Sequence, residues 1–244
     1  MAKKTLVVLE NNPAVMTALA TKLGVSPTLT FHDIYSLDPA DLYHIPKPVV
    51  ALLAVVPDSK GRDADKKRED NAGLGADYHD PESKSPLVWF KQTIGNACGS
   101  YGFVHSIMNG PAKEYIIPGS LLDKIRSDAL PLKMEERAKM LYDSQEFEEA
   151  HSACAALGDT VSPEALSEDP FGHYVAFVRV DGHLWELDGD RNGPIDRGVL
   201  ADDEDVLSPR ALDLGLKRII KVEEESGVGD VYFSALALVG ENKN

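Results

Sequence analysis

The sequence predicts an α+β fold in which a central antiparallel β-sheet packs between α-helices. Two apolar segments are joined by Asp181-Gly182, which is the most typical two-residue turn of an antiparallel hairpin. A continuous apolar segment at residues 48–57 is typical of a strand buried on both faces. Segments that begin and end with typical helix-capping residues, such as residues 12–24, occupy much of the remaining chain. Because no linker or repeat is evident, we expect one domain over residues 1–244.

Each element can be placed along the chain. Strands are expected at residues 5–10, 30–37, 48–57, 173–180, 183–189 and 231–240. Helices are expected at residues 12–24, 98–108, 120–129, 133–158 and 203–225. The first helix has Asn12 as its cap and Gly24 just past its end, and Asn96 is the expected cap of the second helix. Residues 58–86 and 158–172 lose apolar periodicity and are predicted as polar surface loops.

The composition excludes several kinds of function. The formal net charge of −15 argues against nucleic-acid binding, which needs a clustered Lys/Arg surface. No apolar segment approaches the about 18–20 residues that span a bilayer, and the first residues lack the apolar length of a signal peptide. Since the chain has only two cysteines, we expect no disulfide framework and a cytoplasmic location without membrane association. The acidity either steers a basic partner or simply keeps the protein soluble.

Cys98 is the first candidate for chemistry. It lies at the expected start of a helix, where free backbone N–H groups favour a thiolate and can donate to an oxyanion. Its neighbours Ala97 and Gly99 are small, so a substrate backbone could approach the sulfur. Gln92, six residues earlier, could supply a second amide donor. From this segment alone, Cys98 could also be a buried packing residue and Gln92 a surface polar residue.

A cysteine nucleophile needs a histidine, and the chain has seven. His105 lies two helical turns from Cys98, about 10 Å along the same helix, which is too far for a hydrogen bond. Five others are expected to be ordinary surface or boundary residues, namely His32, His44, His79, His151 and His183. His173 differs from these because the hairpin places carboxylates across from it.

The hairpin register predicts the partner of His173. If the turn contains two residues, the pairing places His173, Asp188 and Asp190 on one face of the ribbon. Asp188 is then the diagonal neighbour of His173, within reach of a hydrogen bond that would orient the imidazole toward a thiol. Asp190 lies directly opposite His173, but beyond the expected end of the strand. An exposed cross-strand polar pair would produce the same pattern.

These motifs lie in segments that resemble the ubiquitin carboxyl-terminal hydrolase family of cysteine deubiquitinases. The segments "KQTIGNACGSYGFVHSIMNG" and "GHYVAFVRVDGHLWELDGDRNGPIDRG" carry the family's glutamine–cysteine and histidine–aspartate spacings. The segment from Leu9 to Pro57 and the segment "YFSALALVG" are also similar, so the resemblance covers essentially the whole chain. It implies a papain-like cysteine protease fold, in which the helix of the nucleophile runs against the sheet.

The resemblance also implies a reaction, which is hydrolysis at the C-terminal glycine of ubiquitin through a thioester. Cys98 would be the nucleophile, His173 the general base and acid, Asp188 the orienting carboxylate and Gln92 the oxyanion donor. No metal or other cofactor is implied. The enzyme would act as a monomer, and its acidity fits a ubiquitin tail that carries arginines.

Further residues match family positions that handle the substrate. Residues from about 152 to 171 match a crossover loop over the active site, which would favour small or unfolded adducts. Leu9 and Phe233 match positions that contact ubiquitin, although both could equally be ordinary strand residues. Ser100 and Tyr101 depart from the commoner threonine and aliphatic pair, and we expect them to affect specificity more than activity.

Two other functions stay open beside the deubiquitinase. The enzyme could act on another ubiquitin-like modifier that ends in Gly-Gly. The protein could instead bind and sequester free ubiquitin, with incidental catalysis. The complete set of Gln92, Cys98, His173 and Asp188 favours an enzyme, because a binding module needs none of them.

Overall fold

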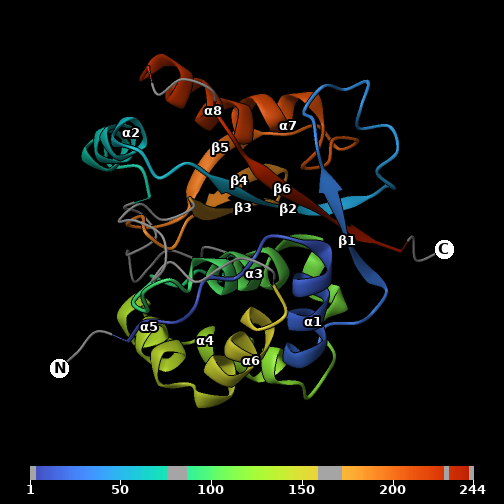
Figure 1. The fold of residues 1–244 in the computed structure, drawn as a ribbon, viewed down its shortest axis with the longest axis vertical. Coiled ribbons are helices and arrows are strands. Elements are labelled where there is room, and N and C mark those ends of the chain that lie inside the picture. The colour runs from blue at the N-terminus through green and yellow to red at the C-terminus, as the bar shows by residue number, and fades with distance from the viewer. Residues whose placement is uncertain (1–3, 76–86, 159–171, 228–230, 242–244) are drawn as a thin grey trace.

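A central antiparallel sheet organises the computed structural model, which describes residues 4–75, 87–158, 172–227 and 231–241 (Figure 1). Within these residues the sheet has six strands, in the spatial order β1-β6-β2-β3-β4-β5. The strands are β1 (Leu29–Ile34), β2 (Val49–Val56), β3 (His173–Val180), β4 (His183–Leu187), β5 (Ile195–Val199) and β6 (Ser234–Gly240). Every neighbouring pair is antiparallel. The predicted antiparallel α+β class is therefore confirmed.

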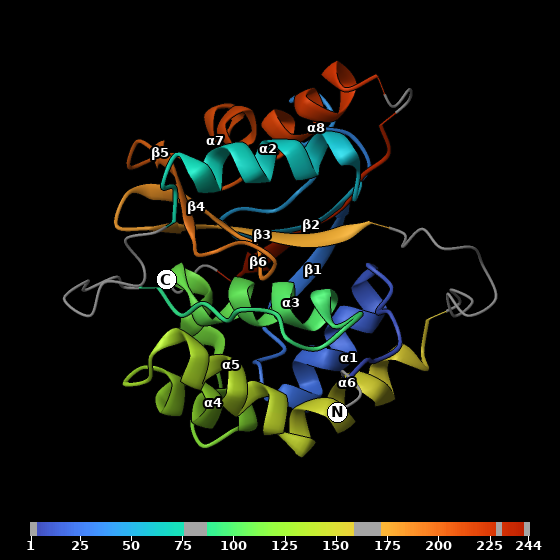
Figure 2. The same cartoon turned by 90° about the vertical axis from the view of Figure 1, so that its left-hand side faces the viewer.

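Helices cover both faces of the sheet (Figure 2). On one face lie α1 (Pro13–Leu23), α3 (Cys98–Met108), α4 (Leu121–Ala129), α5 (Met134–Asp143) and α6 (Gln145–Ala155). On the other face lie α2 (Lys60–Asn71), α7 (Pro209–Leu214) and α8 (Leu216–Glu225). A short 3₁₀-helix, η2 (Gly110–Tyr115), follows α3. The helix α3 lies directly against the sheet, and all of its residues are buried.

The interior strand β2 explains why its segment is apolar throughout. Leu53 joins the hydrophobic core beneath α1 and α3, whereas Leu52 and Ala54 join the second core beneath α7 and α8. Successive side chains of a strand point to opposite faces, so a strand covered on both faces needs apolar residues at every position. The prediction of a buried strand at this segment is confirmed.

The predicted hairpin is also confirmed. Val180 pairs with His183, and the turn residues Asp181 and Gly182 have φ values of 51° and 77°. Positive φ at both central residues is typical of the hairpin turn that matches the right-handed twist of strands. The register therefore follows the pairing on which the prediction for His173 depends.

Helix caps are confirmed at α1 and corrected at α3. The side chain of Asn12 accepts from the backbone N–H of Val15, and Gly24 ends α1 with a φ of 89°. The expected cap at Asn96 is wrong, because Ala97 is the cap residue of α3 and makes no side-chain bond. Asn96 instead has a φ of 57° and turns the chain into the helix.

The predicted polar loop at residues 58–86 is wrong over its first half. Residues Lys60–Asn71 form α2, and the side chain of its cap Ser59 accepts from the N–H of Arg62. Apolar periodicity did not indicate this helix because its buried face is charged. Residues 76–86 of the predicted loop lie outside the described residues.

Other expected elements differ in their bounds. Residues 5–10 form no regular strand; the carbonyls of Val7 and Leu9 bond instead to His151 and Tyr174 side chains. The helix expected at residues 133–158 is two helices, because Ser144 leaves the helical conformation and caps α6.

The C-terminal half differs in two further places. The helix expected at residues 203–225 is split at Gly215, whose φ of −106° and ψ of −103° interrupt it between α7 and α8. The strand β5 was not predicted, because its sequence IDRGV has no clear apolar alternation. No helix in the described ranges is long and apolar enough to cross a membrane.

Candidate active site

Cys98 is the first residue of α3 and lies at the surface of the core, 9% exposed. The first N–H groups of a helix have no helical acceptor, so they point toward groups at this end of α3. The neighbouring element is β3, whose first residue is His173. The fold thus brings together two residues that are 75 positions apart in the chain.

Two glycines allow α3 to approach the sheet closely. A Cβ at Gly102 would lie 2.8 Å from Leu53 and 3.2 Å from Tyr174. A Cβ at Gly99 would lie 3.0 Å from the Cβ of Leu9. Gly99 therefore makes room for packing against Leu9 on this side of α3.

His173 and Asp188 form the predicted cross-hairpin pair. The Nε2 atom of His173 lies 2.6 Å from Oδ1 of Asp188. The strand β4 ends at Leu187, so Asp188 is the first residue beyond it. Because Asp188 occupies Nε2, Nδ1 is the ring atom left for another partner, and the side chain of Cys98 is near enough to raise the pKa of the imidazole.

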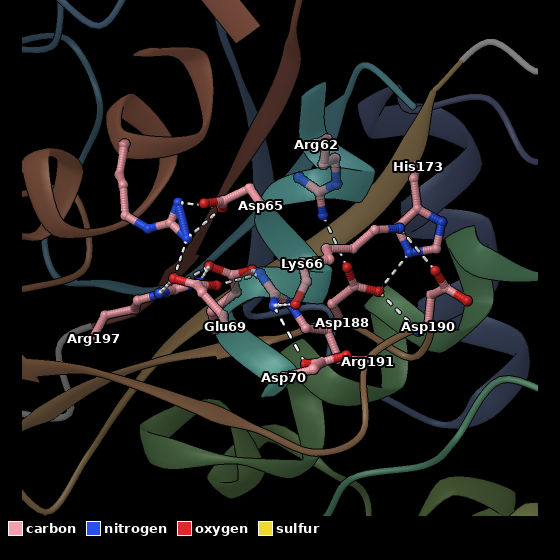
Figure 3. A network of polar contacts seen from close by, with 12 residues as sticks. Arg62, Asp65, Lys66, Glu69, Asp70, His173, Asp188, Asp190, Arg191 and Arg197 are labelled. Carbon is pink, nitrogen blue, oxygen red and sulfur yellow. Dashed lines mark hydrogen bonds and ion pairs between the residues drawn. The ribbon is translucent and has the colours of Figure 1, made fainter. Parts of the chain in front are cut away.

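Asp188 is completely buried, and each of its carboxylate oxygens has partners. Oδ1 also accepts from the backbone N–H of Asp190 at 2.8 Å. Oδ2 accepts from Nη2 of Arg62 at 2.9 Å. The backbone carbonyl of Asp188 accepts from the indole N–H of Trp89 at 3.1 Å. These contacts hold the carboxylate in one orientation toward His173 (Figure 3).

The charges of the site shift two pKa values in opposite directions. Burial alone would lower the pKa of His173, but the Asp188 carboxylate and the Cys98 sulfur raise this pKa to about 10. Burial also opposes ionisation of Asp188, yet His173 and Arg62 hold the pKa of that carboxyl well below its usual range. At neutral pH the pair is therefore an imidazolium beside a carboxylate.

Asp190, the rival orienting residue, has a different partner. Its carboxylate lies 2.8 Å from Nζ of Lys66 on α2. Asp190 contacts Asp188 through its backbone N–H, which donates to Oδ1 of Asp188. The structure thus agrees with the prediction that the diagonal residue, and not the directly opposite one, bonds to His173.

Gln92 lies beside the segment that carries Asp188. Its backbone N–H donates to the carbonyl of Gly189 at 2.8 Å, and a Cβ at Gly189 would lie 3.0 Å from the Cβ of Gln92. Its side-chain Nε2 donates to the carbonyl of Ile94 at 3.1 Å. One hydrogen of this amide remains for another acceptor, since the NH₂ group carries two.

The comparisons with known proteins agree with this geometry. The family model "Ubiquitin carboxyl-terminal hydrolase, family 1" matches residues 6–221. The chain belongs to this family. The Arabidopsis thaliana protein named ubiquitin carboxyl-terminal hydrolase 3 is 33% identical over 231 residues, which cover 94% of this chain and 92% of the relative. The Homo sapiens ubiquitin carboxyl-terminal hydrolase isozyme L1 is 32% identical, over 94% of this chain and 96% of the relative.

A solved structure confirms the fold that the resemblance implied. The Trichinella spiralis UCH37 catalytic domain, bound to ubiquitin vinyl methyl ester, superposes with a TM-score of 0.73 at 21% identity. The match covers 99% of this chain and 98% of the other chain. The papain-like architecture of the ubiquitin carboxyl-terminal hydrolases is therefore that of this family member.

The residues expected to handle substrate lie in different surroundings. The side chain of Leu9 is 2% exposed and packs in the core beneath Gly99. Phe233 is half-buried and packs against the core beneath α7 and α8. Of the crossover loop expected at about 152–171, the first residues belong to the end of α6, and residues 159–171 lie outside the described residues.

Packing explains the two residues after Cys98 and Gly99 at which this chain departs from the common family pattern. Ser100 is fully buried and its hydroxyl lies 2.8 Å from Nδ1 of His151, while Nε2 of His151 lies 2.6 Å from the carbonyl of Val7. His151 was expected to be a surface or boundary residue, which is wrong, since it is completely buried. Tyr101 is likewise a core residue. The serine therefore joins α3 to α6 and to the N-terminal segment.

Arg62 is a second residue that the sequence did not indicate. It lies on α2, on the opposite face of the sheet from α3, and reaches Asp188 from that side. The signal that could have located it is a charged stripe with helical spacing, but such stripes are ordinarily solvent-exposed.

Proposed function

We propose that this protein is a cysteine hydrolase that cleaves bonds at the C-terminal glycine of ubiquitin. The observation that carries the proposal is the position of His173, which bonds to Asp188 and interacts electrostatically with Cys98 in a chain of this family. The named relatives are ubiquitin carboxyl-terminal hydrolases, and they are covered over nearly their whole length. We take residues 1–244 as one catalytic domain.

The first step is attack by Cys98 on the carbonyl of the ubiquitin glycine. The nucleophile is the Cys98 thiolate, and the imidazolium of His173 next to it is the proton donor of this step. The sulfur forms a bond to the carbonyl carbon, and the departing amine or thiol takes a proton from His173. The product of this step is a thioester with Cys98.

The negative oxygen that forms on the carbonyl needs donors. The remaining side-chain hydrogen of Gln92 and the N–H groups at the start of α3 are suited to this role. The hydrogen bond from the backbone N–H of Gln92 to the carbonyl of Gly189 fixes the backbone of Gln92, so its side-chain amide needs little rearrangement during the reaction.

The second step is hydrolysis of the thioester. Neutral His173 takes a proton from water, the hydroxide attacks the thioester carbon, and the sulfur leaves to restore Cys98. Asp188 keeps the imidazole oriented through both steps. The reaction needs no metal or cofactor in this scheme.

The substrate class is the finer part of the proposal. If the segment that follows α6 crosses the active site, as the family resemblance implies, it would admit small or unfolded adducts more readily than large folded ones. Contact with ubiquitin is supported better at half-buried Phe233 than at Leu9, whose side chain would need its surroundings to open. We further propose a cytoplasmic monomer whose partner is ubiquitin, without nucleic acid or membrane, in keeping with the net charge of −15.

A fluorogenic ubiquitin C-terminal adduct tests the proposal. Wild type should turn over, and Cys98→Ala should lose at least about 10³-fold in kcat/KM because no other group can form the thioester. The matched control is Cys154→Ala, which removes the other cysteine, buried in the core and outside the site, and should keep the catalytic rate.

Three outcomes would contradict this reading. Full activity of Cys98→Ala would remove the nucleophile. Tight ubiquitin binding by wild type without turnover would instead favour the sequestering function. If the enzyme cleaved an adduct of another modifier that ends in Gly-Gly faster than the ubiquitin adduct, that modifier, and not ubiquitin, would be the preferred substrate.

A further inference from the structure

Helix α2 has an unusual buried face, which is made of charged residues. The buried positions are Arg62, Asp65, Lys66 and Glu69. Their spacing of three, four and seven residues is that of the apolar face of an ordinary surface helix. This helix is therefore docked on the protein by ion pairs, and each of its buried charged residues has specific partners.

The partners divide the helix into two parts (Figure 3). Toward its C-terminal end, Asp65 bonds to Arg218 at 2.8 Å, and Glu69 bonds to Arg197 at 2.7 Å and to Arg191 at 2.6 Å. These contacts join α2 to α8, to β5 and to the loop after β4. Within the described residues, none of these three guanidinium groups bonds to the Asp188 carboxylate, although the backbone N–H of Arg191 donates to the Asp188 carbonyl at 3.2 Å.

The N-terminal part of α2 contacts the active site itself. Arg62 is 3% exposed, and its guanidinium lies 2.9 Å from Oδ2 of Asp188. The other carboxylate oxygen faces His173 at 2.6 Å. In Figure 3, Asp188 lies between Arg62 and His173. Rotation of the carboxyl group about its bond would break both contacts together.

We propose that Arg62 is a positioning residue of the reaction, which holds the Asp188 carboxylate so that Oδ1 bonds to Nε2 of His173. This inference rests on the proposed function. A carboxylate with Oδ2 buried and without a partner would be costly, so without Arg62 the group would turn toward another donor or take up a proton. Either change weakens the bond that orients His173 toward Cys98.

The test compares Arg62→Met with Arg218→Met. Arg62→Met removes the ion pair of α2 with Asp188, whereas Arg218→Met removes two ion pairs that dock α2, those with Asp65 and Glu69, and leaves Asp188 untouched. Arg62→Met should lower kcat by about 10-fold to 100-fold with little change in KM, since small misplacement of a catalytic group costs about this much. Arg218→Met should stay within about twofold of wild type, and Arg62→Lys, which keeps the charge, should recover part of the loss.

A proton NMR measurement gives a second readout, independent of turnover. The imidazole proton in the short His173–Asp188 bond should appear as a strongly downfield resonance in wild type and in Arg218→Met. In Arg62→Met it should disappear or move upfield. If Arg62→Met does not fold, the same pair of measurements on Arg62→Lys and Arg218→Lys decides the question.

The outcomes separate the two proposals. If Arg62→Met and Arg218→Met have equal kcat, or if the resonance is the same in both, Arg62 only docks the helix and the inference is overturned. If wild type cleaves no ubiquitin adduct, the proposed function fails, and the resonance alone still tests whether Arg62 positions Asp188.

Discussion

At the scale of single residues, the contact between His173 and Asp188 connects the chemistry of the site to the stability of the fold. The two side chains come from neighbouring ends of one hairpin, and both are largely buried. The hairpin therefore places the two side chains next to each other without a distant element. In our proposal Arg62 then holds the Asp188 carboxylate in the orientation of this contact, and Cys98 gives the contact its function.

The raised pKa of His173 predicts a pH-dependent contribution to stability. A histidine with a folded pKa of about 10 and an unfolded value of 6.5 stabilises the fold fully below about pH 6.5, and this contribution is lost as pH rises through about 10. The free energy of unfolding of wild type minus that of His173→Gln should therefore be largest near pH 6 and shrink toward pH 10.

Denaturant unfolding at a series of pH values measures this difference. His44→Gln, at an exposed position outside the site, controls for the loss of a histidine as such. A difference that stayed constant, or grew with pH, would show that His173 is not held as an imidazolium.

At the scale of elements, the active site depends on how closely α3 approaches β2 and β3. The distance between these elements is set by Gly99 and Gly102, which place no side chain between helix and sheet. The same approach sets the distance between the first residues of α3 and β3, which are Cys98 and His173.

Gly102→Ala should therefore impair both stability and activity. The new Cβ would lie 2.8 Å from Cδ1 of Leu53 and 3.2 Å from Cβ of Tyr174, so the buried Leu53 side chain, the helix or the strand must shift. Overpacking of this kind costs about 1–3 kcal/mol, more than the about 1 kcal/mol that alanine gains over glycine within a helix. Denaturant unfolding and kcat for the ubiquitin adduct measure the two effects. A variant that is more stable than wild type and equally active would mean that α3 has free space here.

The elements that were not predicted share a physical cause. The buried face of α2 is charged, the strand β5 has little apolar alternation, and the break at Gly215 lies within an otherwise helical pattern. In each case the decisive interaction comes from another part of the chain: Asp188 for α2, Glu186 and Glu69 for Arg197 in β5, and the ring of Phe177 beside Gly215. The periodicity of apolar residues in a sequence indicates only those helix and strand faces that are buried by apolar side chains.

At the scale of the whole molecule, the formal charge of −15 favours encounter with a basic partner. If the arginine-bearing tail of ubiquitin is attracted by this charge, kcat/KM should fall as ionic strength rises from about 0.01 M to about 1 M, which shortens the Debye length from about 30 Å to about 3 Å. The value of kcat, which describes the bound complex, should change much less. Steady-state rates at several salt concentrations measure both, and a salt-independent kcat/KM would leave the acidity with no role beyond solubility.

The sequence by itself determined the class of the fold and the local geometry of the site. A two-residue turn and the alternation of strand side chains place Asp188 beside His173, because both depend only on nearby backbone conformation. Likewise, Cys98 begins a helix within a few residues of the expected start. Tertiary structure alone decided what surrounds this set: Arg62 against Asp188, and Ser100 against His151. Buried polar groups need partners, and which partners they meet depends on the packing of elements that lie far apart in the chain.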